Sequence, residues 1–233
     1  MHLDVAVAKV RKYAVPESGD TIEMVERPNG GVSFVVVDGQ RSGKSAKAIS
    51  NLVARKAVSL LAEGVRDGAA ARAAHDYLYT SRSGKVSATL NIVSIDLESR
   101  SLVLSRNSHC PIVLVQAGEL QVLDQPSHPV GVHRGTKPVI SEIPLSPGTT
   151  VVIYTDGLIA AGERKGQALD VPRAVRELSA HPLTAKQLAR ELLDRALALD
   201  EQRPADDISI LVLTISKFDQ PNDARWLNVS MPL

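Results

Sequence analysis

Apolar and β-branched residues form short runs along much of the chain, a pattern typical of strands. Near its start, valines at positions 5, 7 and 10 stand among polar residues and indicate one strand. Residues 20–26 (DTIEMVE) and 31–38 (GVSFVVVD) predict two more, joined by a Pro-Asn-Gly-Gly turn of the kind found in hairpins. The first part of the chain is therefore expected to be β-structure.

Two helices are predicted next. Apolar residues recur at helical spacing from Ala46 to Leu61, and an alanine-rich helix is expected from about Asp67 to Tyr79. Residues 85–124 then return to short β-branched runs, separated by the segments LESR, NSHCP and QAGE. Connections this short favour antiparallel meanders, because a parallel crossover takes about a dozen or more residues.

The remaining elements complete the predicted order. Residues 140–157 (ISEIPLSPGTTVVIYTDG) predict two strands around a Ser-Pro-Gly turn. A helix from about Thr184 to Leu199 follows, with Thr184 as its N-cap. Residues 207–216 (DISILVLTIS) form the last predicted strand. This order favours an α+β fold, a four-layer α-β-β-α sandwich of two mainly antiparallel sheets flanked by helix pairs.

The domain organisation is expected to be simple. Residues 1–217 are predicted to form a single domain, and residues 218–233 a polar C-terminal tail. Trp226 and Leu227 are the tail's large apolar side chains and could dock on the body or on a partner.

Composition excludes several classes of protein. Of the 233 residues, 44% are hydrophobic and 23% charged, as is ordinary for a soluble globular chain. The net charge of +1 gives no indication of nucleic acid or a membrane as partner, and Arg and Lys are scattered along predicted helices as on solvated faces. Cys110 is the single cysteine, which excludes an internal disulfide and a cysteine-only zinc site. Without a signal-peptide pattern or an apolar run of ~18 residues, a cytoplasmic location is expected.

Acidic residues stand at the ends of predicted strands. Asp38 follows SFVVV, Asp156 follows VVIYT, the pair Asp206-Asp207 precedes ISILVLTI, and Asp20 opens TIEMV. An acid beside an apolar strand is costly unless it is hydrated, hydrogen-bonded or neutralised by a cation. Taken singly, each is explained as a turn former or helix cap. Together they indicate a site for Mg²⁺ or Mn²⁺, which prefer oxygen ligands.

A different chemistry is possible for the loop after Asp38. Gly39, three residues and then Gly43-Lys44-Ser45 approach a phosphate-binding P-loop, and VVIYTD could act as its Walker B strand. The gap is one residue too short, and Asp38 would lie beside the phosphates. A P-loop nucleotide-binding protein is therefore the remote alternative.

Seven short motifs follow one another along nearly the whole chain, from Asp20 to Ile215. They are SGD (18–20), VVVDGQRSG (35–43), SATL (87–90), NSHCP (107–111), HPVGV (128–132), LSPGTTVVIYTDGL (145–158) and ADDISILVL (205–213). In this order they resemble the metal-dependent PPM (protein phosphatase 2C-like) serine/threonine phosphatases. Within that family the chain is similar to the SpoIIE/RsbU/RsbX branch, and most of all to RsbX.

The resemblance implies a site for two Mn²⁺ or Mg²⁺ ions. Asp38 corresponds to the carboxylate that bridges both ions, the carbonyl of Gly39 and Asp20 to ligands of one ion, and Asp156 and Asp206 to ligands of the other. A metal-bridging hydroxide would attack the phosphorus of a phosphoserine or phosphothreonine. The implied substrates are phosphorylated regulatory proteins, such as STAS-type anti-sigma-factor antagonists or stressosome components.

Other positions carry weaker expectations. Asp207 is adjacent to a ligand position and is the lower-ranked metal candidate. His109 in NSHCP and His128 are interpreted as loop residues before prolines, and Cys110 as buried filler.

The metal-site loop departs from the usual pattern of the branch. Asp38-Gly39-Gln40-Arg41-Ser42-Gly43 stands where Asp-Gly-x-Gly-His-Gly or Asp-x-x-Gly-His-Gly is usual, and Ser in place of His is a feature of RsbX-like members. Arg41 is expected either to reach substrate phosphate or to point into solvent. The missing His leaves the general acid unassigned, which opens the alternative of an inactive phosphatase-like module that holds a phosphoprotein.

Overall fold

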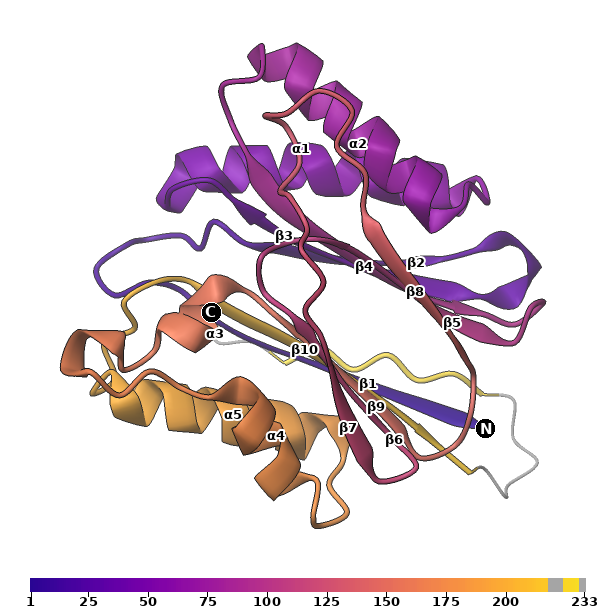
Figure 1. Ribbon diagram of the computed structural model, residues 1–233, viewed down its shortest axis with the longest axis vertical. Coiled ribbons are helices and arrows are strands. Elements are labelled where there is room, and N and C mark those ends of the chain that lie inside the picture. The colour runs from indigo at the N-terminus through magenta and orange to yellow at the C-terminus, as the bar shows by residue number, and fades with distance from the viewer. Residues whose placement is uncertain (218–223, 231–233) are drawn as a thin grey trace.

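The structure is a computed structural model that describes residues 1–217 and 224–230. It consists of two five-stranded sheets packed face to face, with helices on both outer faces (Figure 1). The elements run in the order β1 (His2–Val10), β2 (Thr21–Glu26), η1 (Pro28–Gly30), β3 (Val32–Gly39), α1 (Gly43–Ala62), α2 (Asp67–Arg82), β4 (Ala88–Asp96), β5 (Ser101–Asn107), β6 (Ile112–Gln116), β7 (Glu119–Leu123), β8 (Val139–Pro144), β9 (Thr149–Tyr154), α3 (Asp156–Ala160), η2 (Glu163–Lys165), α4 (Val171–Leu178), α5 (Ala185–Leu199) and β10 (Ile208–Ser216).

The two sheets are antiparallel throughout. Sheet A has the order β1-β10-β9-β6-β7, and sheet B the order β2-β3-β4-β5-β8. Every neighbouring pair in them is antiparallel. The predicted α+β sandwich is therefore confirmed.

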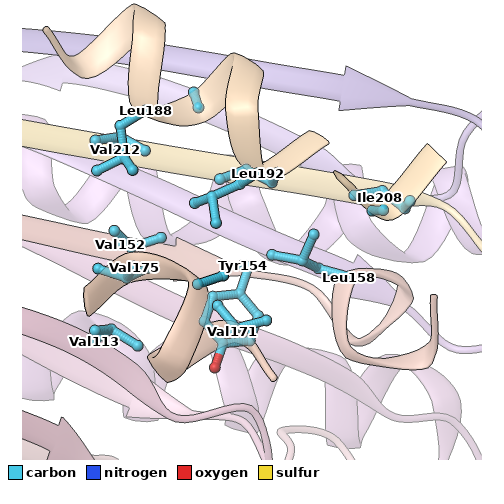
Figure 2. Packing of buried hydrophobic residues seen from close by; sticks show 14 of the residues in the cluster. Val113, Val152, Tyr154, Leu158, Val171, Val175, Leu188, Leu192, Ile208 and Val212 are labelled. Carbon is cyan, nitrogen blue, oxygen red and sulfur yellow. The ribbon is translucent and has the colours of Figure 1, made fainter. Parts of the chain in front are cut away.

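The alternation of side chains along the strands explains the four layers. In β3, Val35 and Val37 pack against α1 and α2, whereas Phe34 and Val36 point toward sheet A. In β9, Val152 and Tyr154 face α4 and α5, where Leu192 packs on them (Figure 2). Each such fully buried side chain contributes about 1.5–3 kcal/mol to stability. Both faces of each central strand are thus covered, which is why these runs are almost continuously apolar.

Two short connections cross from one sheet to the other, and one of them was predicted as part of a meander. The LESR and QAGE turns join hairpin neighbours, but NSHCP leads from β5 in sheet B to β6 in sheet A. The Ser-Pro-Gly turn likewise joins β8 in sheet B to β9 in sheet A. A short connection can cross between packed sheets as readily as it can close a hairpin, because both need a chain reversal of a few residues. The meander prediction is therefore wrong at NSHCP, whereas the two strands predicted around the Ser-Pro-Gly turn are present.

Helix ends agree with the sequence to within a few residues. Thr184 forms a capping box with Gln187 at the start of α5, as its N-cap role predicts. Ser42 occupies the N-cap position of α1, although its hydroxyl makes no capping hydrogen bond. The helices α3 and α4 were not predicted individually. No helix in the described ranges has the length and apolarity that a membrane span needs.

The predicted tail falls partly outside the described residues, which omit positions 218–223 and 231–233. In the part described, Arg225 forms an ion pair with Glu26 at 3.1 Å, and the side chains of Trp226 and Leu227 are exposed.

Candidate active site

The predicted acids gather at one end of the sandwich, the end that carries α3 (Figure 1). A pocket of about 310 Å³ opens there between the two sheets, lined by Asp38 from β3, Asp156 from α3 and Asp206 before β10. Lys12, Arg41 and His109 also line it. Sheet B thus supplies Asp38 and sheet A the other two acids, so the pocket exists only because the sheets pack together.

Glycines set the positions of two of these carboxylates. A Cβ atom on Gly39 would lie 2.1 Å from the carbonyl oxygen of Ala46, and one on Gly157 would lie 2.1 Å from that of Asp207. Only glycine allows α1 to approach the end of β3, and α3 to approach the start of β10, this closely. The repeated strand–Asp–Gly unit is therefore required by backbone packing behind each acid.

Asp20 lies behind the pocket and is fully buried. Its carbonyl oxygen accepts hydrogen bonds from the ammonium groups of Lys9 and Lys47, both at 2.6 Å, and its Oδ2 accepts one from the Thr155 hydroxyl at 3.0 Å. Its other carboxylate oxygen, Oδ1, has no hydrogen-bond partner among the described residues. A buried oxygen left in this way is costly unless a cation or water approaches it.

The carboxylates raise one another's pKa values. Burial raises the pKa of Asp20 to about 6, and burial together with the charges of Asp20 and Asp156 raises the pKa of Asp38 to about 9. Burial and the charge of Asp206 also raise the pKa of Asp156, whereas His109 lowers it. Without a cation these groups bind protons more tightly than isolated carboxyls do. Their oxygens are the hard donors that Mg²⁺ and Mn²⁺ prefer, so the residues present fit such an ion.

The acids surround the pocket without closing on one point. Within the described ranges, no three side chains of His, Cys, Asp or Glu are grouped closely enough to hold a metal ion. Asp156 and Asp206 keep exposed side chains, at 40% and 42% of their full accessible area. Ions at this site would therefore draw on backbone oxygens or water in addition to carboxylates.

Asp207 has a different role from its neighbour Asp206. Its carboxylate is buried, and its two oxygens accept hydrogen bonds from the backbone N–H groups of Lys12 and Gly19, both at 2.8 Å. It therefore fixes both ends of the loop between β1 and β2. That loop delivers Lys12 to the pocket rim and leads directly into Asp20.

The loop between Asp38 and α1 is pinned to the start of β4. Gln40 exchanges two hydrogen bonds of 3.1 Å with the backbone of Ser87. Arg41 follows with a φ of +79°, and its side chain is exposed at the rim. Gly43 begins α1, so Lys44 and Ser45 belong to a helix that leaves an antiparallel sheet. A P-loop, which requires a parallel β-α-β unit, is not supported.

Some residues that line the pocket or support it from behind had no sequence signal. Lys12 lies in a loop that the sequence leaves featureless, and Thr155 is hidden within VVIYTD. His109, interpreted as a loop residue, places Nε2 3.7 Å from Oδ2 of Asp156 at the pocket rim. The crossing of NSHCP between the sheets brings it there. Cys110 beside it is buried, and burial together with the charge of Asp156 raises the pKa of its thiol to about 12. A thiol of this kind stays protonated and acts only as an apolar core residue.

Comparison with known structures gives the same fold. The PP2C phosphatase domain of SpoIIE from Bacillus subtilis, solved with a fragment of its regulatory domain, superposes with a TM-score of 0.80 at 18% identity, covering 92% of this chain and 64% of that one. The SiaA PP2C domain of Pseudomonas aeruginosa gives 0.73 at 22% identity, with coverage of 90% and 85%. The RsbU and RsbW domains of a Mycobacterium tuberculosis protein give 0.73 at 22% identity, with coverage of 92% and 60%. The chain thus spans less than two thirds of the first and third of these proteins.

Sequence comparison identifies the family. No curated protein matches the chain significantly. The family profile described as Stage II sporulation protein E (SpoIIE) matches residues 28–216, which contain Asp38, Asp156 and Asp206. The chain therefore belongs to the SpoIIE family and has the fold of a PP2C phosphatase domain.

Proposed function

We propose that this chain is a single phosphatase domain, within residues 1–217, that hydrolyses phosphoserine or phosphothreonine on a regulatory protein with two Mn²⁺ or Mg²⁺ ions. The observation that carries the proposal is the grouping of Asp38, Asp156 and Asp206 around one pocket with the buried Asp20 behind it. These four carboxyls come from distant parts of the chain, and the fold brings them to one end of the sandwich.

The metal ions would be held by these carboxylates and by the carbonyl of Gly39. The unpaired Oδ1 of Asp20 and the raised pKa of Asp38 support this, because both favour a positive charge close by. Bound divalent ions would lower the pKa of a water molecule and neutralise charge on the phosphoryl oxygens. Asp207 would act from outside the coordination sphere by fixing the loop that carries Asp20.

The chain's own residues can bind and orient a phosphate ester. Lys12 and Arg41 lie on the rim of the pocket and carry the positive charge that a phosphoryl group seeks. Lys12 Nζ is 3.9 Å from Asp206 Oδ1, so it is near the carboxylate without a hydrogen bond to it. Asp207 fixes the backbone of Lys12, and the ammonium group, which forms a long ion pair with Asp206, would turn from that carboxylate toward substrate.

The proposed substrate class is supported by the proteins in which similar folds occur. Similar folds occur in the RsbU and RsbW domains of a Mycobacterium tuberculosis protein and in a protein described with the bacterial stressosome. Ser42, in the position where the branch usually has His, favours an RsbX-like member. We therefore propose a phosphorylated STAS-type anti-sigma-factor antagonist or stressosome component as substrate.

The test is hydrolysis of p-nitrophenyl phosphate and of a phosphoserine peptide in Mn²⁺, Mg²⁺ or EDTA, with wild type beside Asp38→Asn. Phosphate release that needs the metal and is lost in Asp38→Asn is expected. Calorimetric titration with Mn²⁺ is the second readout. Metal binding without turnover would contradict the proposal and indicate the inactive binding module instead.

A further inference from the structure

Three segments that border the pocket contain no acidic residue: 39–62, 77–95 and 125–141. None of the chain's 26 Asp and Glu residues lies in them, whereas nine of its 27 Lys and Arg residues do. The net charge of +1 conceals this asymmetry because acids elsewhere balance it. These nine cations lie far apart in the sequence, so only the fold can bring them onto one surface.

The fold joins the three segments around the pocket. Gln40, Ser87 and Pro129, one from each segment, line it. The hydrogen bonds between Gln40 and Ser87 connect the first two segments, and a β-bridge between Ala88 and Val130 connects the second and third. The surface on this side of the pocket is therefore one continuous rim.

The third segment is also attached to the C-terminal half of α2. The Nε of Arg134 donates a hydrogen bond to the hydroxyl of Tyr79 at 3.1 Å, and the backbone N–H of Gly131 donates one to Nδ1 of His75 at 2.9 Å. These bonds hold the guanidinium of Arg134 over the end of α2, next to the turn that carries Lys85. Arg134 and the segment that carries it are thus fixed relative to the end of α2.

Four exposed cations on this surface define what we call the basic rim: Arg41, Lys44, Lys85 and Arg134. Among the residues that the structure describes, none of the four forms an ion pair. Several exposed cations elsewhere on the molecule are paired, Arg173 and Arg195 with Glu177, and Lys165 with Glu201. The rim therefore presents uncompensated positive charge.

We propose that the basic rim is a docking surface for acidic residues that flank the phosphorylated residue of a protein substrate. The inference rests on the proposed phosphatase function and adds the chemistry of the substrate. A protein segment can place one phosphoryl group in the pocket and its carboxylates on the rim. A nucleic acid fits less well, because its continuous phosphates would cross the pocket carboxylates Asp38, Asp156 and Asp206.

The expected strength is modest and depends on salt. Exposed charge pairs contribute about 0.2–1 kcal/mol each, so two or more contacts change the specificity constant by about tenfold. Dissolved salt screens the attraction between exposed charges, and the Debye length is about 8 Å at physiological ionic strength. The preference for acidic substrates should therefore decrease as salt is added.

The experiment compares two phosphoserine peptides that differ only in having Glu or Gln at the flanking positions. The readout is the ratio of their kcat/KM values at low and high NaCl, for wild type and for the double variant Lys85→Gln/Arg134→Gln. The matched control is Lys186→Gln/Arg190→Gln, two exposed cations of α5. We expect a ratio of about ten in wild type and control, and about two in the rim variant. Equal ratios in wild type and rim variant overturn the proposal.

Failure of the proposed function is distinguishable. If neither peptide is hydrolysed in Mn²⁺, fluorescence anisotropy measures their binding to wild type and the rim variant. Tighter binding of the acidic phosphopeptide, lost in the rim variant, supports the docking surface without catalysis. Equal binding of both peptides overturns it, as does binding of a single-stranded oligonucleotide more tightly than of the acidic phosphopeptide.

Discussion

The backbone of Gly39 packs directly against the backbone of Ala46, so that a Cβ atom on Gly39 would lie 2.1 Å from the carbonyl oxygen of Ala46. The last residue of β3 therefore fixes the distance between Asp38 and the first turn of α1. We predict that Gly39→Ala lowers the free energy of unfolding by about 3 kcal/mol, because the backbone of β3 or of α1 has to move to make room for the methyl group. Urea denaturation followed by circular dichroism measures this.

Gly118→Ala is the control for that substitution. Gly118 has a φ of +83° and nothing within 4 Å of the added Cβ, so its replacement costs only the left-handed conformation, about 1 kcal/mol. Equal losses in the two variants would show that steric contact with Ala46 is unimportant.

Asp206 and Asp207 are adjacent yet should respond differently to the same change. In Asp207→Asn an amide NH₂ group replaces one of the two oxygens that accept from the backbone N–H groups of Lys12 and Gly19. One of these N–H groups is then left without an acceptor, so the free energy of unfolding should fall by about 1–3 kcal/mol. Asp206→Asn affects a half-exposed side chain and should leave stability within about 0.5 kcal/mol while weakening Mn²⁺ binding. Thermal denaturation in EDTA and calorimetric titration with Mn²⁺ separate the two. A destabilised Asp206→Asn with a stable Asp207→Asn would reverse the assignment.

The raised pKa values predict how stability depends on pH in the absence of metal. Asp20, at about 6, and Asp38, at about 9, hold their protons more tightly in the folded chain than at the ordinary value of 3.8. The folded state then binds more protons than the unfolded one, so the free energy of unfolding falls as pH rises from about 4 toward 9. Asp20 contributes to the loss below about pH 6, and Asp38 continues it to about pH 9.

Urea denaturation in EDTA between pH 5 and pH 9 measures this decline. Mg²⁺ should reduce it, because the cation takes the place of the protons. Asp38→Asn should flatten it above pH 6, since the amide does not ionise. Stability that rises with pH in EDTA would exclude the predicted direction.

Arg41 occupies a backbone conformation that favours glycine, with a φ of +79°. Arg41→Gly should therefore stabilise the chain by about 1 kcal/mol. If the guanidinium meets substrate phosphate, the same variant should raise KM for a phosphoserine peptide by about tenfold, the usual effect of losing a charged hydrogen bond. Steady-state kinetics and denaturation together measure the two effects. An unchanged KM would place Arg41 in solvent.

Most of the fold was predictable because its signals are local. Val35 and Val37 alternate with Phe34 and Val36 along β3, as a strand covered on both faces requires. Thr184 and Gln187 form the capping box that marks the start of α5. The crossing of NSHCP from one sheet to the other has no local signal, since a hairpin and a crossing use the same turn residues.

The candidate site was predictable in its acids and less so in its cations. Asp38 and Asp156 each follow an apolar run and precede a glycine, a combination that stands out in a sequence. Lys12 reaches the pocket only because Asp207, nearly two hundred residues away along the chain, binds its backbone at 2.8 Å. Arg134 joins the rim through Tyr79 in a similar way. Such tertiary contacts leave no pattern in the residues near them.

The position of β10 has a consequence for the order in which the protein forms. This strand lies between β1 and β9 in the interior of sheet A, and Asp206 and Asp207 immediately precede it. A chain still emerging from the ribosome can pair sheet B, whose strands end at Pro144, but its first strand has no partner in sheet A until β10 has been synthesised. The pocket is therefore completed only after β10 has been synthesised, so a chain that terminates before β10 has the helices and strands of sheet B and no complete site.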